Sequence, residues 1–415
     1  MDETRIDVTQ TDGLKLSWED VTWEPTTPAQ AMDRARLSVV GRPYRAAVPA
    51  AIERMQFEID PDVAARAEDA RAAITRFDAE LSAMFDGEFA PLSAVLLRTE
   101  SASSSQIENI TVGARALSLA DVGLAKFGSN ASLVQANVEA MNRALELTGS
   151  LTPGHILAVH EALMHGQDEA DPGQFRDQQV WIGGTDYSPH RADFVPPLDS
   201  RIYKSIKDLC AFSERTDLPL LAQAAIAHAQ FETIHPFNDG NGRAGRALVH
   251  VMLRNGGATT RTTVPVSAGL LSDTDAYYDA LTAYRNGDPN PIVEEFSRAA
   301  FAAVRNGQQL ATDLRTLHDG WANNLLARRD AVAWRVLPFL LGQPSVTSKL
   351  VQDTFKVTQP AADNAMRQLQ EAGALSKPKA VHGEGQKRNV VWQATEVLEA
   401  LDRFGERARR TSRTG

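Results

Sequence analysis

The 415-residue sequence contains one cysteine, Cys210, and lacks any run of about 18 apolar residues. A single cysteine excludes a disulfide within the chain and suits a reducing compartment. Because a membrane-spanning helix needs such an apolar run, we expect no membrane segment. The first residues are polar and acidic, which is not typical of a signal peptide. We therefore expect a cytoplasmic protein that does not enter a membrane.

A second absence concerns nucleotide binding. The Walker-type phosphate loop, a glycine-rich stretch that ends in Gly-Lys followed by Ser or Thr, does not occur in the sequence. Any nucleoside phosphate must then be bound by another kind of loop.

The composition is that of an ordinary soluble globular protein, 43% hydrophobic and 23% charged, and the length allows two or three domains. The net charge of −10 is uneven: residues 331–415 hold 13 Lys and Arg against 8 Asp and Glu, whereas residues 1–330 hold 30 against 45. A basic C-terminal piece indicates an anionic partner such as DNA. A solvated basic tail over residues 405–415 would account for much of the same excess.

The rest of the chain is organised around His235-Pro-Phe-Asn-Asp-Gly-Asn-Gly-Arg-Ala-Gly-Arg246. Before it, Leu218 to Phe231 is rich in Ala and Leu and predicts a helix. After it, Ala247 to Arg254 predicts a second helix, which a Gly-Gly pair ends. The stretch is therefore a tight polar loop between two helices.

The loop combines groups that suit a polyphosphate. Gly240 and Gly242 let a ligand approach the backbone, where successive N–H groups and the start of the second helix favour an anion. Arg243 and Arg246 lie three apart on one helical face, and their side chains match phosphate oxygens. Gly, Asn and Asp also turn well in ordinary loops, so a Gly-Asn-Gly alone would be weak support.

Two further side chains add chemistry. Asp239 offers a hard oxygen ligand for a magnesium ion that stays bound to phosphates. His235, with an ordinary pKa of about 6.5, suits a general base near neutral pH. Together with the glycines and arginines, they predict a site for a nucleoside polyphosphate with a proton acceptor beside it.

The loop resembles the signature of Fic-domain proteins, HPFx(D/E)GNGRxxR, at every position. Members of this family typically transfer AMP from ATP to a hydroxyl side chain of a target protein. The resemblance implies that His235 removes the proton of the attacking hydroxyl and that Asp239 holds the Mg²⁺ that bridges the α- and β-phosphates. Phe237 would anchor the loop in the core.

The other signature positions would bind the phosphates. Arg243 would bind the departing phosphates, and Arg246 would reach the γ-phosphate. The implied anion hole consists of Asn241 with the backbone of Gly240 and Gly242. ATP is then the substrate and Mg²⁺ the cofactor, and the reaction is an in-line displacement at phosphorus that depends on positioning and charge stabilisation.

A second motif, Ser104-Ser-Gln-Ile-Glu108-Asn109, resembles the autoinhibitory motif of the family, (S/T)xxxE(G/N). Its motif positions are Ser104, Glu108 and Asn109. The implied mechanism is that the Glu108 carboxylate pairs with Arg246 and denies this arginine to the γ-phosphate, so that ATP binds misaligned. Another interpretation is that Ser105 and Glu108 form a capping box at the start of a helix, and both can hold at once.

The stretch from Val180 to Pro189 alternates apolar and polar residues around a Gly-Gly pair, which predicts a hairpin. It resembles the Fic flap, which holds the target backbone by strand addition and presents its hydroxyl to the histidine. The docking residues would be Val180, Ile182, Gly183 and Gly184. A plain surface hairpin is the alternative.

A helix is also predicted from Thr152-Pro153, a good N-cap and first-turn pair. It carries His155, His160 and His165, but no other metal ligands cluster with them. We interpret these residues as surface or packing histidines.

Residues 1–91 loosely resemble the segment that precedes the core of many Fic proteins. We expect this segment to be helical, with a run from Ala51 and a second helix at Pro61–Met84. Residues 92–325 form the expected Fic core, which starts with a helix at Leu92–Thr99. Helices from Tyr278 to about Leu325 complete it.

Residues 331–404 predict a winged helix-turn-helix domain, similar to the module that many Fic proteins carry at this end. Helices are expected at Val332–Leu341 and Ala361–Ala372, the latter with Thr358 as N-cap and Gly373 as its C′ residue. The strand candidates are Ala374–Ser376 and Asn389–Gln393, and a basic turn from His382 to Arg388 separates them.

In a DNA-binding version, the helix after Thr358 would enter the major groove. Its exposed candidates are Gln359, Asn364, Arg367 and Gln368. The net charge of this helix is low, and such modules also serve as protein-contact or dimerisation units.

The sequence thus predicts a mainly α fold: a Fic helical core with a small β-hairpin flap and a C-terminal winged helix-turn-helix domain. The leading hypothesis is a protein adenylyltransferase (AMPylase) that is autoinhibited in cis by Glu108 and modifies a protein hydroxyl, its own included. Removal of AMP, or transfer from another nucleotide or phosphate donor, is the alternative within the family. A DNA-binding regulator whose Fic core senses nucleotide is the alternative of another class. The resemblance also implies a homodimer.

Overall fold

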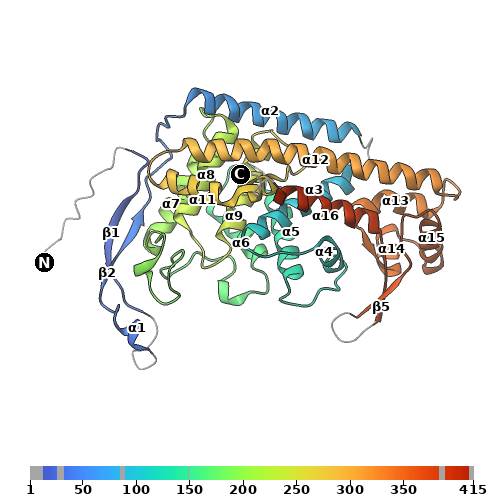
Figure 1. The fold of residues 1–415 in the computed structure, drawn as a ribbon, viewed down its shortest axis with the longest axis horizontal. Helices are drawn as coiled ribbons and strands as arrows, with labels where there is room; N and C mark the ends of the chain where they lie inside the picture. Colours follow the sequence, from blue (N-terminus) through green and yellow to red (C-terminus); the bar gives the residue numbers. More distant parts are fainter. Residues whose placement is uncertain (1–12, 26–31, 85–88, 148, 383–387, 411–415) are drawn as a thin grey trace.

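The computed structural model describes residues 13–25, 32–84, 89–147, 149–382 and 388–410. The molecule is elongated and mainly helical, as the sequence predicts (Figure 1). Two long helices, α2 (Pro61–Met84) and α12 (Asn290–Asn324), run side by side along one flank. A two-stranded sheet lies at one end and a module with a three-stranded sheet at the other. Within the described ranges, no helix combines the length and the apolar character needed to span a bilayer.

The N-terminal part differs from the helical segment expected there. β1 (Ser17–Thr22) pairs antiparallel with β2 (Pro43–Val48), and Ser17 lies opposite Val48. Between the strands lies the four-residue helix α1 (Arg34–Leu37). The long helix α2 begins at Pro61, as predicted.

The helical run expected from Ala51 is wrong. The backbone N–H groups of Ile52 and Glu53 donate to the two carboxylate oxygens of Asp208, at 2.7 and 3.1 Å. A side chain distant in sequence therefore takes the donors, and Ile52 is fully buried in the core. A tertiary contact overrides the local helical preference.

The centre of the fold is α8 (Leu220–Ile234), in which every residue from Leu221 onward is buried. α9 (Asn241–Asn255) packs against it. The two helices approach closely at Gly245, where a Cβ would lie 2.9 Å from the Phe231 ring, so the crossing requires glycine. These are the two helices predicted on either side of the polar loop.

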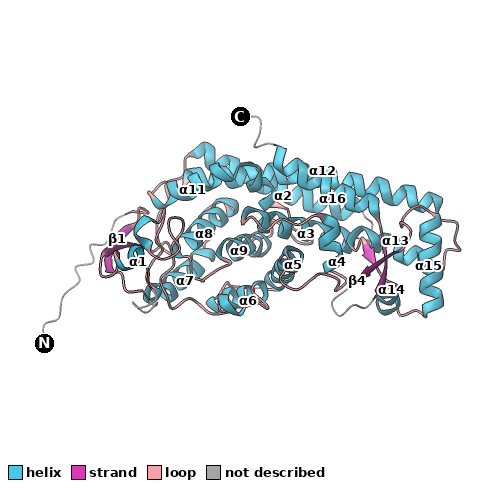
Figure 2. Cartoon of the chain, turned by 60° about the horizontal axis from the view of Figure 1, so that its bottom comes forward, coloured by secondary structure: helices cyan, strands magenta, loops and turns pink. Residues whose placement is uncertain are grey.

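Further helices surround this pair, as Figure 2 shows. They are α3 (Phe89–Ile107), α4 (Ala114–Ala120), α5 (Asn130–Glu146), α6 (Pro153–Leu163), α7 (Asp199–Ser213), α10 (Val266–Leu270) and α11 (Thr274–Arg285). Short 3₁₀ turns lie at Asp168–Ala170, Pro189–Arg191 and Leu271–Asp273.

The C-terminal module alternates helices and short strands. In chain order it contains α13 (Val332–Gly342), β3 (Ser345–Val346), α14 (Ser348–Phe355), α15 (Gln359–Glu371), β4 (Lys379–His382) and β5 (Arg388–Gln393). β5 is the central strand, and β3 and β4 pair with it antiparallel on either side.

Within this module, both predicted helices and the second strand are confirmed, but the first strand is not. Thr358 is the N-cap residue of α15, although its side chain makes no capping hydrogen bond, and Gly373 has the left-handed φ of 84° expected after a helix. Ala374–Ser376 forms no strand, because the N–H groups of its first two residues bond back to Leu369 O and close α15. The basic turn predicted before β5 falls largely on residues 383–387, outside the described residues.

α16 (Thr395–Arg410) leaves the module and returns along α12. Arg407 Nε donates to Asn306 Oδ1 at 2.6 Å, and Arg407 Nη1 lies 3.8 Å from Asp313 Oδ2. Residues 405–410 therefore continue α16, which packs against α12, although Arg409 stays exposed. Residues 411–415 lie outside the described residues.

Candidate functional site

His235 is the first residue beyond α8 and has a left-handed φ of 49°. This backbone, costly for a residue with a side chain, turns the chain sharply out of the helix. The ring is 18% exposed, and its Nδ1 lies 3.9 Å from Glu232 Oε2. Burial, together with the charges of Arg176 and Arg285, lowers the pKa of His235 to about 3. The imidazole is therefore neutral at physiological pH and able to accept a proton.

Asn241 closes the loop that follows His235. Its Oδ1 accepts from Phe237 N and its Nδ2 donates to Phe237 O, both at 2.9 Å. Phe237 is fully buried, as predicted, and its ring stacks on His160 with centroids 3.6 Å apart. The side chain of Asn241 is thus used within the loop. Its contribution to an anion site would be the backbone N–H at the start of α9.

His160 is a buried packing residue, as the sequence analysis favoured, and it also orders the loop. Its Nδ1 accepts from Gly173 N at 3.2 Å, which leaves Nε2 to donate to Asp239 O at 3.1 Å. Burial lowers the pKa of His160 to about 4, so the ring stays neutral. Gly240 lies beside it with a φ of 76°, and a Cβ there would be 2.9 Å from the Met164 sulfur.

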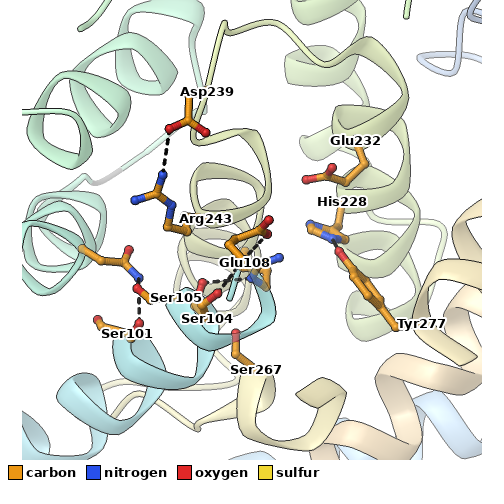
Figure 3. Close-up of polar contacts among 12 residues, drawn as sticks. Ser101, Ser104, Ser105, Glu108, His228, Glu232, Asp239, Arg243, Ser267 and Tyr277 are labelled. Atoms are coloured by element: carbon orange, nitrogen blue, oxygen red, sulfur yellow. Dashed lines mark hydrogen bonds and ion pairs between the residues drawn. The ribbon is translucent and has the colours of Figure 1, made fainter. Parts of the chain in front are cut away.

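Arg243 and Asp239 face each other at the mouth of the loop (Figure 3). The Arg243 side chain is 3% exposed; its Nη2 lies 3.4 Å from Asp239 Oδ2, whereas Nε and Nη1 have no hydrogen-bond partner among the described residues. A buried guanidinium with unused donors fits a phosphate group. The Asp239 side chain is 63% exposed, which fits a Mg²⁺ ion that keeps water and phosphate ligands.

Arg246, one turn further along α9, donates hydrogen bonds through two of its three guanidinium nitrogens. Nη2 donates to Glu108 Oε1 and to Ser104 O, both at 2.8 Å, and Nε donates to Ser104 Oγ at 2.9 Å. Burial opposes the charged form of Arg246, but Glu108, Tyr277 and Glu232 together outweigh it and raise the pKa of the guanidinium. The motif residues Ser104 and Glu108 therefore both contact the arginine.

Glu108 lies just beyond the end of α3, so the capping-box interpretation is wrong. Asn109 has a left-handed φ of 62°, and Ile110 N donates to Ser105 O at 3.0 Å, which is a C-terminal cap. The Glu108 carboxylate lies against Gly242 in the first turn of α9, where any Cβ would collide with Oε1. The Glu108 carboxylate thus lies at the N-terminus of α9, where the sequence predicts an anion site.

The predicted flap is a loop with isolated bridges rather than a regular hairpin. Ile182 N donates to Phe194 O at 2.8 Å, and Phe194 N donates to Ile182 O at 3.2 Å. Gly183 and Gly184 both have a φ of 75° and make the predicted turn, whereas Val180 lies before the bridged pair. The return half of the loop bonds to β2 through Val195 O, which accepts from Ala47 N at 3.0 Å.

Arg176 connects the flap to His235, a role that the sequence analysis missed. The buried side chain donates through Nε to His235 O at 2.8 Å, through Nη1 to Gln178 O at 2.8 Å and through Nη2 to Pro197 O at 2.6 Å. Burial lowers the pKa of Arg176 to about 10. Its place at the end of Asp171-Pro-Gly-Gln-Phe-Arg176, before the flap, was the single available signal.

A second buried carboxylate, Glu232, lies in the last turn of α8. Burial and the charge of Glu108 raise the pKa of Glu232 to about 7, against the opposing charges of Arg246 and Arg285. Arg285 Nη2 donates to the Glu232 carbonyl at 3.3 Å, and its guanidinium lies over the Phe194 ring. Nothing in the sequence pattern set Glu232 apart from the other acidic residues of predicted helices.

The geometry joins the polar loop, the flap and the end of α3 in one site, and comparison with known families gives the same grouping. Residues 150–253, which contain the flap, α8 and the start of α9, match one family model. That model is the Fic/DOC family. Residues 64–146, which contain Glu108, match the model of the Fic/DOC family N-terminal region.

Curated relatives with Fic names match part of the chain. Protein adenylyltransferase fic-1 of Caenorhabditis elegans is 27% identical over 154 residues, which is 36% of this chain and 27% of that protein. Protein adenylyltransferase Fic of Drosophila willistoni is 30% identical over 156 residues, 37% of this chain and 28% of that protein. The matched regions therefore span under a third of these relatives.

Similarity to a solved structure supports the fold. The crystal structure of a Fic family protein from Desulfovibrio desulfuricans covers 81% of this chain and 97% of its own, with a TM-score of 0.52 and 23% identity. This similarity shows the Fic fold.

Proposed function

We propose that this chain is a nucleotidyltransferase that transfers AMP from Mg-ATP to a hydroxyl group of a protein, and that Glu108 inhibits it in cis. The observation that carries the proposal is a neutral His235 at the end of α8, followed in the first turn of α9 by Arg243, a buried guanidinium with two unused nitrogen donors. The Fic/DOC match and the names of the curated relatives support the same class of reaction.

In the proposed reaction, the hydroxyl oxygen of the target forms a bond to the α-phosphorus while the bond to the departing pyrophosphate breaks. The proton passes to His235, and Arg243 binds the departing phosphates. Asp239 would hold Mg²⁺, which neutralises phosphate charge when bound. A bound polyphosphate also raises the pKa of His235 from its low resting value, because a nearby anion favours the imidazolium.

The proposed inhibition acts through Arg246. Its Nε and Nη2 donors are engaged by Ser104 and Glu108 at 2.8–2.9 Å, so they are not available to a γ-phosphate. Glu108 also brings its own negative charge to the N-terminus of α9, where it repels a phosphate. Removal of this carboxylate is expected to free both the arginine and the anion position.

The test measures transfer of label from α-labelled ATP with Mg²⁺ by wild type, Glu108→Gly and Glu108→Gly/His235→Ala. Glu146→Gly, at the exposed last residue of α5, controls for loss of a glutamate at a helix end. We expect wild type and the control near background, the Glu108 variant self-labelled, and the double variant silent. If folded Glu108→Gly stays silent with all four α-labelled nucleotides, self-transfer is excluded.

The alternative reactions need separate assays. Release of AMP from a target that already carries it would show the removal reaction. Transfer of label from other nucleotide or phosphate donors would show the other transfer reactions. If only removal of AMP is observed, comparison of wild type with Glu108→Gly shows whether Glu108 takes part in that reaction.

We also propose that the C-terminal module is a winged helix-turn-helix domain. The order α13-β3-α14-α15-β4-β5, with β5 central in the sheet, supports this. Arg367, exposed on α15, pairs with Glu371 of the same helix at 3.0 Å, which favours contact with protein over DNA. Fluorescence anisotropy with random duplex DNA tests DNA binding, and sedimentation of the full chain tests the predicted homodimer.

A further inference from the structure

Glu232 is a buried carboxylate for which the proposed chemistry has no role. The residue is 7% exposed, and its Oε1 has no hydrogen-bond partner among the described residues. Its Oε2 lies 3.9 Å from His235 Nδ1, across the end of α8. A buried carboxylate with an unused oxygen is costly to maintain, so its retention in the fold calls for an explanation.

The charges around Glu232 come from four elements. The titratable and charged groups near it are His228 and His235 of the α8 end, Arg246 of α9, Glu108 beyond α3, and Tyr277 and Arg285 of α11. His228 is already bonded to the Tyr277 hydroxyl at 2.7 Å, and Arg246 to Glu108 and Ser104. The imidazole of His235 is thus the neighbour whose chemistry changes during the proposed reaction.

His235 needs a nearby anion when it accepts a proton. The cations Arg176 and Arg285 both act against the imidazolium, and with burial they lower the pKa of the ring to about 3. A carboxylate that accepts the Nδ1–H of an imidazole fixes its tautomer and stabilises the charged ring. Glu232 offers a carboxylate oxygen 3.9 Å from Nδ1, a separation of the kind that tightens in a catalytic complex. In the resting structure, the Glu232 backbone also favours the charged ring.

We propose that Glu232 is the positioning residue of His235, whose ring it orients through Nδ1 and whose imidazolium it stabilises. The inference rests on the proposed transferase function. In the step concerned, the hydroxyl oxygen bonds to the α-phosphorus, the leaving pyrophosphate oxygen keeps the electron pair of the broken bond, and the proton moves to His235 Nε2. Nδ1 keeps its own proton, which faces Glu232.

The inhibitory element affects the same carboxylate. Burial comes first among the causes that raise the pKa of Glu232, and the charge of Glu108 comes second. When Glu108 leaves Arg246, the pKa of Glu232 falls and the carboxylate ionises more readily. Release of inhibition therefore prepares His235 as well as Arg246.

The kinetic test compares Glu232→Gln and Glu232→Asp in the Glu108→Gly background. For Glu232→Gln we expect kcat to fall about 100-fold, because the variant no longer stabilises the imidazolium that forms during transfer. KM for ATP should change less than about twofold, because the neutral ring of the ground state does not need this carboxylate. The acidic limb of the kcat–pH profile of Glu232→Gln should move to lower pH, because the pKa of His235 falls when the nearby anion is removed. Glu232→Asp should recover part of kcat. Glu295→Gln removes another buried carboxylate, one paired with Arg298, and should leave kcat unchanged.

A second readout does not depend on activity. In ¹⁵N-histidine-labelled protein, we expect His235 to be mainly the Nδ1–H tautomer in Glu108→Gly, and this fraction to fall in Glu232→Gln. An unchanged tautomer, or a loss of kcat without a shift of the acidic limb, would overturn the inference. If Glu108→Gly itself transfers nothing, the proposed function fails, while the tautomer comparison still decides whether Glu232 orients the ring.

Discussion

At the scale of single residues, Arg243 and Arg246 show how position decides function. They lie three residues apart at the start of α9, and both side chains are almost fully buried. Arg246 donates through Nε and Nη2 to Ser104 and Glu108, whereas Arg243 keeps Nε and Nη1 without a partner among the described residues. In the proposed function, Arg246 would therefore be the controlled group and Arg243 the phosphate ligand that is ready to bind.

Ser104→Ala should relieve the inhibition partially. The variant removes the Oγ that accepts from Arg246 Nε but keeps the Ser104 carbonyl and the Glu108 carboxylate. Loss of one charge-assisted hydrogen bond should raise basal self-labelling by about tenfold, below the level of Glu108→Gly. Initial rates with α-labelled ATP check this order. Labelling equal to wild type would show that the hydroxyl does not restrain Arg246.

Arg176→Met should lower activity without removing any group that is proposed to bind the phosphates. Three carbonyl groups, those of His235, Gln178 and Pro197, would lose their donor. In the Glu108→Gly background we expect kcat to fall at least about tenfold, because small displacements of a catalytic group are costly. Arg201→Met, which breaks a half-exposed pair with Glu19, is the control. Equal kcat values for both variants would contradict the positioning role of Arg176.

At the scale of elements, a polar contact anchors α2 to the segment after α9. The Asp78 carboxylate accepts hydrogen bonds from the backbone and hydroxyl groups of Thr260 and Thr262, at 2.7–3.0 Å. Burial opposes the charged form, but these bonds outweigh it and lower the pKa of Asp78. Because the folded pKa lies below the unfolded one, this stabilisation is present above the unfolded pKa and is lost as pH falls through the folded pKa.

Asp78→Ala should therefore destabilise the fold by about 3 kcal/mol, since it leaves several donors without a partner. The loss appears as a lower Tm in thermal unfolding at neutral pH. Asp69→Ala, at an exposed position of the same helix, should change Tm little. A matching Tm for the two variants would mean that the contact contributes nothing to stability.

At the scale of the whole molecule, buried histidines determine how stability depends on pH. Burial holds the pKa of His160 at about 4 and the pKa values of His228 and His235 at about 3, below the usual 6.5. The unfolded chain therefore binds more protons as pH falls below 6.5, and the folded state loses stability. Glu232, with a pKa of about 7, acts in the opposite sense above 4.5, as do Asp121, Asp208 and Glu295, whose pKa values burial also raises.

We expect Tm to be lower at pH 5.5 than at pH 7.5, because each buried histidine contributes up to about 1.4 kcal/mol per pH unit in this window. Scanning calorimetry of the full chain at matched ionic strength measures the difference. A Tm that is equal or higher at pH 5.5 would show that these rings are already protonated in the folded protein.

Local sequence patterns predicted a mainly helical Fic fold, the two helices beside the polar loop, and residue types suited to phosphate binding, metal binding and proton transfer. These features are local: helical propensity, turn chemistry and motif spacing act over a few residues. The C-terminal helices were predicted for the same reason. The site residues assigned from the Fic signature remain to be tested by the experiments above.

Features that depend on contacts between distant residues became apparent in the tertiary structure. It replaced the helix expected at Ala51 by an irregular segment bonded to Asp208, and placed Glu108 at a helix end beside Gly242 rather than at a helix start. It also buried Arg176 and Glu232 next to His235, since burial and low local dielectric arise when separate elements pack. Charge in a buried site depends on neighbours in space, which sequence spacing does not reveal.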